Sequence, residues 1–287
     1  MYICGQKELL SDINTLIDKN KFPHFAILVG CVGFGKKLLA DYIAMRLGAN
    51  FVPCGIKAEE VRDVIYNSYT VTEKTLYMFF DCDDMSVTSK NALLKVTEEP
   101  PNDSYFIMTV QDLSSVLGTI VSRATVFYMN PYSVSDIDDY IEKNDFDFDD
   151  KTRSIVRQIC TCPNDAKIAS STDIKAVYDT ADKFIQFIGA ANLANELKIA
   201  TTLNLKKDDS EKSDKIDPVM FMRCILLCCS QMVSQDGVVP EDIKVFHSII
   251  KETSKSLIEF QAKGSNKQSV IDNWIVSTHM AVSGGAF

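Results

Sequence analysis

The sequence predicts an α/β fold with a parallel sheet in its first 131 residues, followed by two all-helical parts. Short apolar segments there have the length and composition of buried parallel strands, and helical patterns alternate with them. Such alternation is typical of a parallel sheet with helices on both faces. Beyond Asn130-Pro131 only helices are predicted. We therefore expect three domains, over residues 1–131, 132–172 and 173–287.

The elements of the first domain follow from their residue patterns. Apolar side chains recur at helical spacing over residues 6–20, which predicts a helix. FAILVG (25–30) is an apolar run ending in glycine, typical of a buried strand. The helix that starts near Ser86 is expected to end before Pro100-Pro101, because proline disfavours helical geometry in the residue before it. The remaining predicted helices cover 36–47 and 59–68, and the remaining strands 75–80, 104–110 and 124–129.

The helical parts carry fewer signals. The residue pattern over 133–171 predicts three short helices and no strand. From 173 the pattern is again helical, interrupted by the charged segment KKDDSEKSDKID (206–217), which predicts a solvated loop. Trp274, with Ile271 and Ile275, is expected to pack inside this helical part and not to stack on a base.

Composition excludes several classes of function. The net charge of −9 and the pI of about 4.9 give no overall basic surface for nucleic acid, so any DNA contact requires a local patch or a neighbouring subunit. The nine cysteines are irregularly spaced and only three histidines are present, which predicts reduced thiols in a cytoplasm and no zinc or other metal cluster. We expect no signal peptide and no membrane span, and hence no membrane partner.

A phosphate-binding loop is predicted between the first strand and the next helix. GCVGFGKK (30–37) nearly matches GxxxxGK[ST] in the strand-to-helix context that the motif requires. Gly30, Gly33 and Gly35 allow backbone N–H groups to surround phosphates, and Lys36 is expected to reach the β- and γ-phosphates. Lys37 replaces the hydroxyl that holds Mg²⁺, so metal coordination is weakened or lost. The alternative is a glycine turn without a ligand.

The residues that follow the strand 75–80 show a second departure from the pattern of a nucleotide-hydrolysing site. Asp81 holds the position expected for magnesium, whereas Cys82 occupies the position of the carboxylate that activates water. A thiol replaces this carboxylate poorly. Asp83 is a possible substitute, but its side chain is expected on the other face of the strand end. The alternative is that these acids only cap the sheet edge in solvent.

Several stretches resemble the clamp-loader branch of the AAA+ proteins, with delta-prime subunits of DNA polymerase III from bacteria and phages as the nearest likeness. SKNALLKVTEEPP (89–101) and TIVSRA (119–124) are similar to the two most specific signatures of that family. Weaker similarity lies in Gly5-Gln6, in Phe22-Pro23-His24 and in EEVR (59–62). The resemblance covers about residues 1–172. The zinc module of many relatives is missing, Ala124 replaces a cysteine, and Lys167 is a poor match to the sensor-2 arginine.

The resemblance implies a five-stranded P-loop core, a small helical lid and a helical collar that joins subunits into a ring. It places Arg123 at the subunit edge as an arginine finger acting in trans on a neighbour's nucleotide, Gln111 at the sensor-1 position, and Arg62 in a region that contacts DNA. The alternative is that Arg123 is an ordinary arginine at the end of a helix. For the basic residues Arg62, Lys90 and Lys95, a solvated face is as good an interpretation as contact with phosphates. Implied partners are other loader subunits, a sliding clamp and primer-template DNA.

Together these patterns predict a degenerate AAA+ ATPase that binds ATP or ADP with Mg²⁺ weakly and supplies Arg123 to another subunit. Two alternatives stay open. One is an active motor subunit that turns over ATP with Lys36, Asp81 and Asp83. The other is a nucleotide-independent adaptor without a role on DNA.

Overall fold

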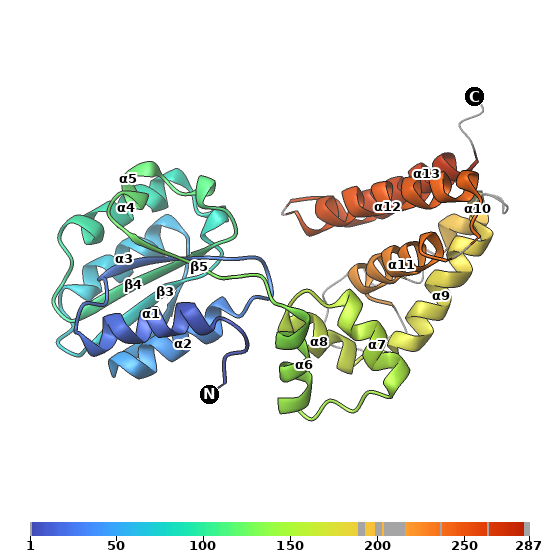
Figure 1. Ribbon diagram of the computed structural model, residues 1–287. Helices are drawn as coiled ribbons and strands as arrows, with labels where there is room; N and C mark the ends of the chain where they lie inside the picture. The colour runs from blue at the N-terminus through green and yellow to red at the C-terminus, as the bar shows by residue number, and fades with distance from the viewer. Residues whose placement is uncertain are drawn as a thin grey trace. The chain divides into compact units, whose positions relative to one another are not determined.

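The computed structural model describes residues 2–188, 193–198, 203, 216–235, 237–262 and 264–283 (Figure 1). The chain forms two compact units, Met1–Asn144 with Thr161–Asp165, and Asp145–Cys160 with Ala166–Phe287. The division into three domains, with boundaries near 131 and 172, therefore stays a proposal. Most of the predicted charged loop at 206–217 lies outside the described residues.

The first unit is built on a five-stranded parallel sheet with the order β2-β3-β4-β1-β5. Its strands are β1 (Phe25–Val29), β2 (Asn50–Cys54), β3 (Thr75–Phe79), β4 (Ser104–Val110) and β5 (Thr125–Tyr128). Its helices are α1 (Lys7–Asp18), α2 (Lys36–Leu47), α3 (Ala58–Ser68), α4 (Val87–Glu98), α5 (Gly118–Val121) and α6 (Val134–Lys143). Two 3₁₀ turns, Cys82–Asp84 and Leu113–Ser115, follow β3 and β4.

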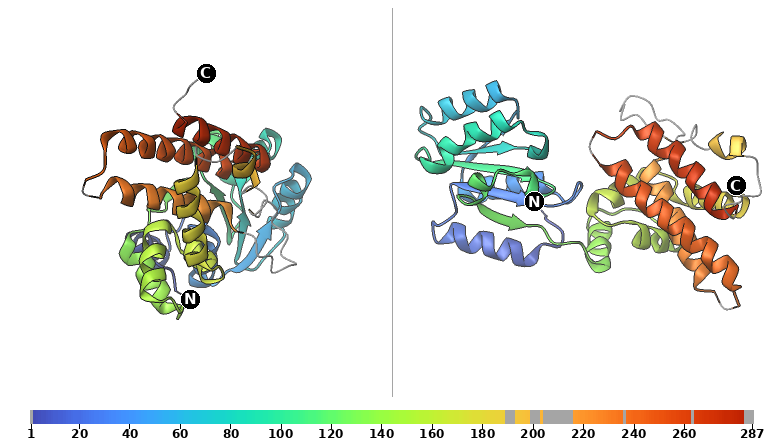
Figure 2. Two further views of the ribbon diagram at one scale, coloured as in Figure 1. Left: turned by 90° about the vertical axis from the view of Figure 1, so that its right-hand side faces the viewer. Right: turned by 90° about the horizontal axis from the view of Figure 1, so that it is seen from above.

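Helices cover both faces of this sheet, as predicted (Figure 2). Every residue of β1 is buried, and its side chains alternate between two cores because successive strand residues point to opposite faces. Ala26 and Leu28 pack with α1 and α2, whereas Phe25, Ile27 and Val29 pack with α3, α4 and α5. Since all strands are parallel, their carboxyl ends meet at one edge of the sheet, here called the carboxyl edge, and their starts meet at the amino edge.

The four strands placed from the sequence are confirmed, and the sheet has the five strands that the resemblance implied. The fifth strand, β2, was not located from the pattern. It contains Pro53 and is only partly buried, and proline is tolerated there because β2 lies at the end of the sheet with β3 as its one neighbour. Its short, mixed pattern resembles a loop.

The predicted helices after residue 131 are also confirmed. α6 is followed by α7 (Asp150–Ile159), α8 (Pro163–Ser170), α9 (Ile174–Phe187), α10 (Leu193–Glu196), α11 (Pro218–Val233), α12 (Pro240–Gln261) and α13 (Lys267–Val282). In the second unit α11 packs between α9 and α12, and α12 packs against α13. The described helices include none with the length and apolar character needed to cross a membrane.

Trp274 lies at the centre of the second unit. Its side chain is fully buried, as are those of Ile271 and Ile275, which confirms that it packs inside the helical part. The rings of Phe184 and Phe221 lie 5.5 and 6.1 Å from its own, centroid to centroid. Its indole Nε1 donates to Thr253 Oγ1 at 3.0 Å, so the one polar atom of the ring is satisfied.

Candidate functional site

The phosphate-binding loop lies at the carboxyl edge, between β1 and α2. Gly33 and Gly35 have φ angles of +83° and +84°, in the left-handed region that glycine adopts without strain. Gly35 immediately precedes α2, whose first helical residue is Lys36. The loop therefore brings backbone N–H groups and a helix N-terminus together, which is the arrangement that binds phosphates. This half of the site fits a nucleotide.

Lys36 is folded back over its own loop. Its Nζ donates to the carbonyl oxygens of Gly30 and of Cys31, the latter at 3.0 Å. A phosphate oxygen could take the place of these carbonyl oxygens as the acceptor for the ammonium group. Lys36 is thus close to where the motif requires it.

Gly33 also packs against the start of α8. A Cβ atom at this position would lie 2.7 Å from Cys162 Sγ and 3.1 Å from Asn164 Cβ, and the Cys162 side chain is buried. The loop is therefore held by a close contact that only glycine permits. Sequence reasoning missed this contact, because nothing local to the loop indicates which distant segment covers it.

We expect Gly33→Ala to destabilise the protein by about 2 kcal/mol, since the new methyl group combines a left-handed backbone with a steric clash. Gly35→Ala is the matched control: its φ is almost the same, but nothing lies within 4 Å of the added atom. For this control about 1 kcal/mol is expected. Urea denaturation of both variants measures the difference, and equal losses would show that the Cys162 contact is unimportant.

The magnesium side of the site does not fit the ion well. Lys37 is exposed, and its Nζ lies 6.0 Å from the centroid of the Phe80 ring, at the end of β3. An ammonium group next to this strand end replaces a hydroxyl ligand with a positive charge. Asp81, also exposed, stays available at the carboxyl edge, and its backbone N–H donates to Thr109 Oγ1 at 3.0 Å.

Cys82 is fully buried in the 3₁₀ turn after β3. Burial raises the pKa of its thiol to about 12, so the group is neutral near pH 7. Its Sγ donates to the carbonyl oxygen of Phe79. A neutral, buried thiol does not orient or deprotonate water, which supports the loss of function inferred at this position.

Asp83 is engaged in holding the loop after β4. Its carboxylate accepts hydrogen bonds from the backbone N–H groups of Gln111 and Asp112 at 3.0 and 3.3 Å, and from Ser115 Oγ at 3.1 Å. These bonds join the turn after β3 to the turn after β4. The carboxylate is therefore committed to structure, which disfavours its use as a substitute for the residue that activates water.

Lys90 departs from both readings of the sequence, because it belongs neither to a solvated face nor to a phosphate-binding surface. Its side chain is buried, and Nζ donates to the carbonyl oxygen of Ser115 at 2.7 Å and lies 3.5 Å from that of Asp83. A buried ammonium requires such partners to offset the loss of hydration.

The other two basic candidates lie elsewhere on the first unit. Lys95 lies over the Tyr69 ring, 4.8 Å from its centroid. Arg62 is exposed on α3.

Parallel strands explain which candidate residues come together. The phosphate-binding loop, Asp81 and Gln111 follow β1, β3 and β4, which are neighbours in the sheet, so all three lie at the carboxyl edge. Arg123 comes just before β5, whose Thr125 is in register with Ala26 at the start of β1. It therefore lies at the amino edge. The five residues of β1 separate the two edges by roughly 16 Å.

Arg123 is presented on the surface of the amino edge. Its side chain is 41% exposed. Nη1 donates to the carbonyl oxygen of Thr119 at 3.0 Å and to Ser122 Oγ at 3.4 Å, and Nη2 lies 3.1 Å from Glu98 Oε1. The guanidinium is thus ordered by its own subunit but distant from its own phosphate-binding loop.

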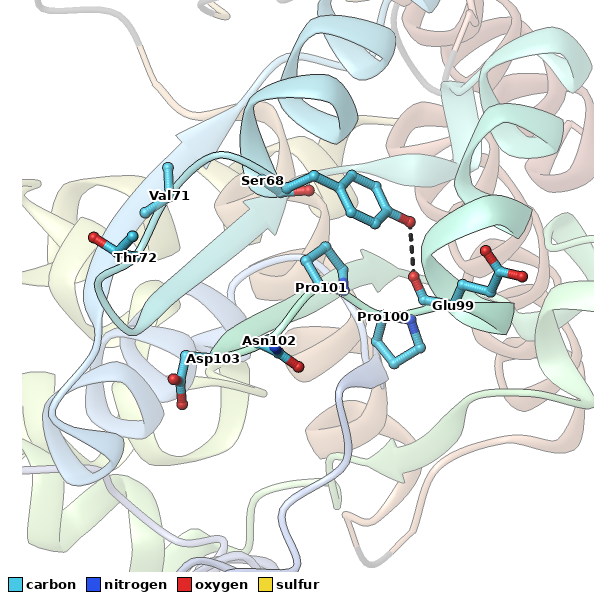
Figure 3. Close-up of a pocket in the computed structure, with 9 residues that line it drawn as sticks. Ser68, Val71, Thr72, Glu99, Pro100, Pro101, Asn102 and Asp103 are labelled. Carbon is cyan, nitrogen blue, oxygen red and sulfur yellow. Dashed lines mark hydrogen bonds between the residues drawn. The ribbon is translucent and has the colours of Figure 1, made fainter.

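The same edge carries an open pocket of about 550 Å³ (Figure 3). It lies between the end of α3 and the Pro100-Pro101 turn, and the Tyr69 hydroxyl donates to the Glu99 carbonyl oxygen there at 2.7 Å. Its lining is Ser68, Tyr69, Val71, Thr72, Glu99, Pro100, Pro101, Asn102 and Asp103. None of the predicted nucleotide residues contributes to it.

Comparison with known proteins agrees with this architecture. A family model described as DNA polymerase III, delta subunit, matches residues 55–133, which include Asp81, Gln111 and Arg123. DNA polymerase III subunit gamma of Buchnera aphidicola (from Schizaphis graminum) is 29% identical over 189 residues, 54% of this chain and 52% of that protein. Over these matched residues the chain is similar to the clamp-loader family of AAA+ proteins. It spans about half the length of this relative.

A further DNA polymerase III subunit and two solved structures are also similar. DNA polymerase III subunit tau of Escherichia coli K12 is 24% identical over 171 residues, 49% of this chain and 27% of that protein. A gamma subunit-related protein from Thermotoga maritima has a TM-score of 0.50 at 13% identity, over 96% of this chain and 99% of that one. The RuvB Holliday junction branch migration motor of T. maritima has a TM-score of 0.51 at 12% identity, over 98% and 88%. These two structures support the fold alone.

Proposed function

We propose that this chain is a delta-prime-like subunit of a DNA polymerase III sliding-clamp loader, acting in the cytoplasm. It supplies Arg123 to the nucleotide of an adjoining subunit and hydrolyses little or no ATP itself. Its partners are the other loader subunits, the clamp and primer-template DNA, with Arg62 as a candidate DNA contact. The observation that carries the proposal is the position of Arg123, exposed at the amino edge and one strand length away from its own phosphate-binding loop.

The argument for action in trans is geometric. An arginine finger stabilises negative charge that develops on the γ-phosphate, so its guanidinium must touch that phosphate. Arg123 cannot touch the γ-phosphate of a nucleotide bound at Gly33 and Lys36, because Arg123 lies at the amino edge of the sheet and the nucleotide would lie at the carboxyl edge. Its exposed fork of donors suits a phosphate presented by another molecule.

The argument for weak hydrolysis is chemical. Gly33, Gly35 and Lys36 suit a phosphate, so ATP or ADP is the expected ligand if one binds. Lys37 removes the hydroxyl ligand of Mg²⁺, and Cys82 is neutral and buried. When bound, magnesium neutralises phosphate charge, and Asp81 is the residue that would hold it here.

The test is ATP hydrolysis by the assembled complex, compared between Lys36→Ala and Arg123→Ala. We expect Lys36→Ala to leave at least about half of the steady-state rate, since the phosphates bound by this lysine are not those cleaved. Arg123→Ala should slow the reaction strongly.

A rate that Lys36→Ala abolishes would favour the active motor instead. Failure of the chain to co-purify with loader subunits or with a clamp would favour the adaptor.

A further inference from the structure

Glu98 and Arg123 meet at the amino edge from two different helices. Glu98 ends α4, and Arg123 follows α5 by two residues. Glu98 Oε1 lies 3.1 Å from Nη2, while the Thr119 carbonyl and Ser122 Oγ accept from Nη1. The guanidinium is therefore held from two sides, by a carboxylate on one helix and by backbone and hydroxyl oxygens on the other.

The two helices that carry Glu98 and Arg123 are fixed independently of this ion pair. α4 buries Leu93 and Val96 completely in the core, and the bond from Tyr69 to the Glu99 carbonyl secures the turn that follows (Figure 3). α5 is anchored by Ile120, which is also fully buried, and the Arg123 N–H donates to the Ile120 carbonyl at 3.0 Å. The backbones of Glu98 and Arg123 therefore keep their separation when the arginine side chain moves.

A long, exposed arginine samples many rotamers, and ordering it when a phosphate arrives costs conformational entropy. A guanidinium has five N–H groups in a planar fork, so one that contacts a carboxylate at one end still has donors for a phosphate. We propose that Glu98 is a positioning residue for Arg123, keeping its guanidinium in the orientation in which it meets the adjoining subunit's nucleotide. This inference rests on the function proposed above.

The experiment uses complexes in which only the adjoining subunit retains an active ATP site. Glu98→Gln keeps the shape of the side chain and removes its charge. We expect kcat to fall by about 5-fold, the upper end of what an exposed ion pair contributes, with KM for ATP unchanged. Glu99→Gln is the matched control, because this carboxylate is the next residue and makes no ion pair with Arg123. It should retain the wild-type kcat.

A double-mutant cycle separates positioning from general damage. In the Arg123→Ala background, Glu98→Gln should have no further effect on kcat. An equal loss in both backgrounds, a wild-type kcat for Glu98→Gln, or an equal loss for Glu99→Gln would each overturn the role of Glu98. If Arg123→Ala alone leaves the rate unchanged, the proposed function fails and this inference fails with it. If Arg123→Ala is slow but Glu98→Gln is not, only the inference fails.

Discussion

Replacing Arg123 by alanine should lower ATP hydrolysis at the adjoining site by about 10³-fold, the lower end of the effect of an arginine finger. The loss falls on the chemical step, because the guanidinium neutralises charge that appears as the γ-phosphate is transferred. Binding of ATP by the adjoining subunit should change little. Single-turnover hydrolysis and nucleotide titration measure the two effects separately, in a complex whose other ATP sites are disabled.

Arg46→Ala is a suitable control for this experiment. Arg46 is also a partly exposed arginine paired with a carboxylate, at 2.7 Å from Asp18, but it lies on α2 and its hydrogen bonds go to residues of α1 and α2. Its removal should leave hydrolysis unchanged. Arg123→Lys tests the geometry, because an ammonium group keeps the charge but not the planar fork, and it should recover only part of the rate. Full activity of Arg123→Ala would refute the proposed role of this subunit.

Trp274→Ala should destabilise the second unit by about 3–5 kcal/mol, which is typical of removing a large aromatic side chain from a core. The substitution leaves a cavity between Phe184 and Phe221 and removes the partner of the Thr253 hydroxyl. Trp274→Phe is the control, since it keeps most of the volume but loses the hydrogen bond, and about 1–2 kcal/mol is expected.

Hydrogen exchange measured by mass spectrometry localises this effect. Faster exchange is expected in α9, α11, α12 and α13, which surround the tryptophan, and not in β1, β3 and β4. Equal acceleration in both units would mean that the units do not unfold separately. Because the chain contains a single tryptophan, fluorescence of the wild-type protein reports on the second unit alone during denaturation.

Much of the fold was predictable from local patterns. β1 and β3 are apolar runs bounded by glycine or acids, and the bounds of α2 are those the sequence predicted. β2 was missed because an edge strand need not be apolar and tolerates Pro53, so its composition resembles that of a loop. Lys90 was misplaced for a related reason. Lysine is usually exposed, and its burial here depends largely on the carbonyl of Ser115, 25 positions away.

Part of the candidate site was likewise predictable from the sequence, and part was not. The phosphate-binding motif with Lys37 in place of its hydroxyl is one short continuous stretch of sequence, and the strand end with Cys82 is another, so the chemistry of each follows from residue type and spacing. The order of the strands in the sheet, by contrast, cannot be read from neighbouring residues along the chain. It places β5 beside β1, and this pairing sets Arg123 at the edge opposite Gly33. The contacts of Glu98 with Arg123 and of Cys162 with Gly33 likewise join segments far apart in sequence. Such contacts depend on packing of the whole unit, which local propensity does not encode.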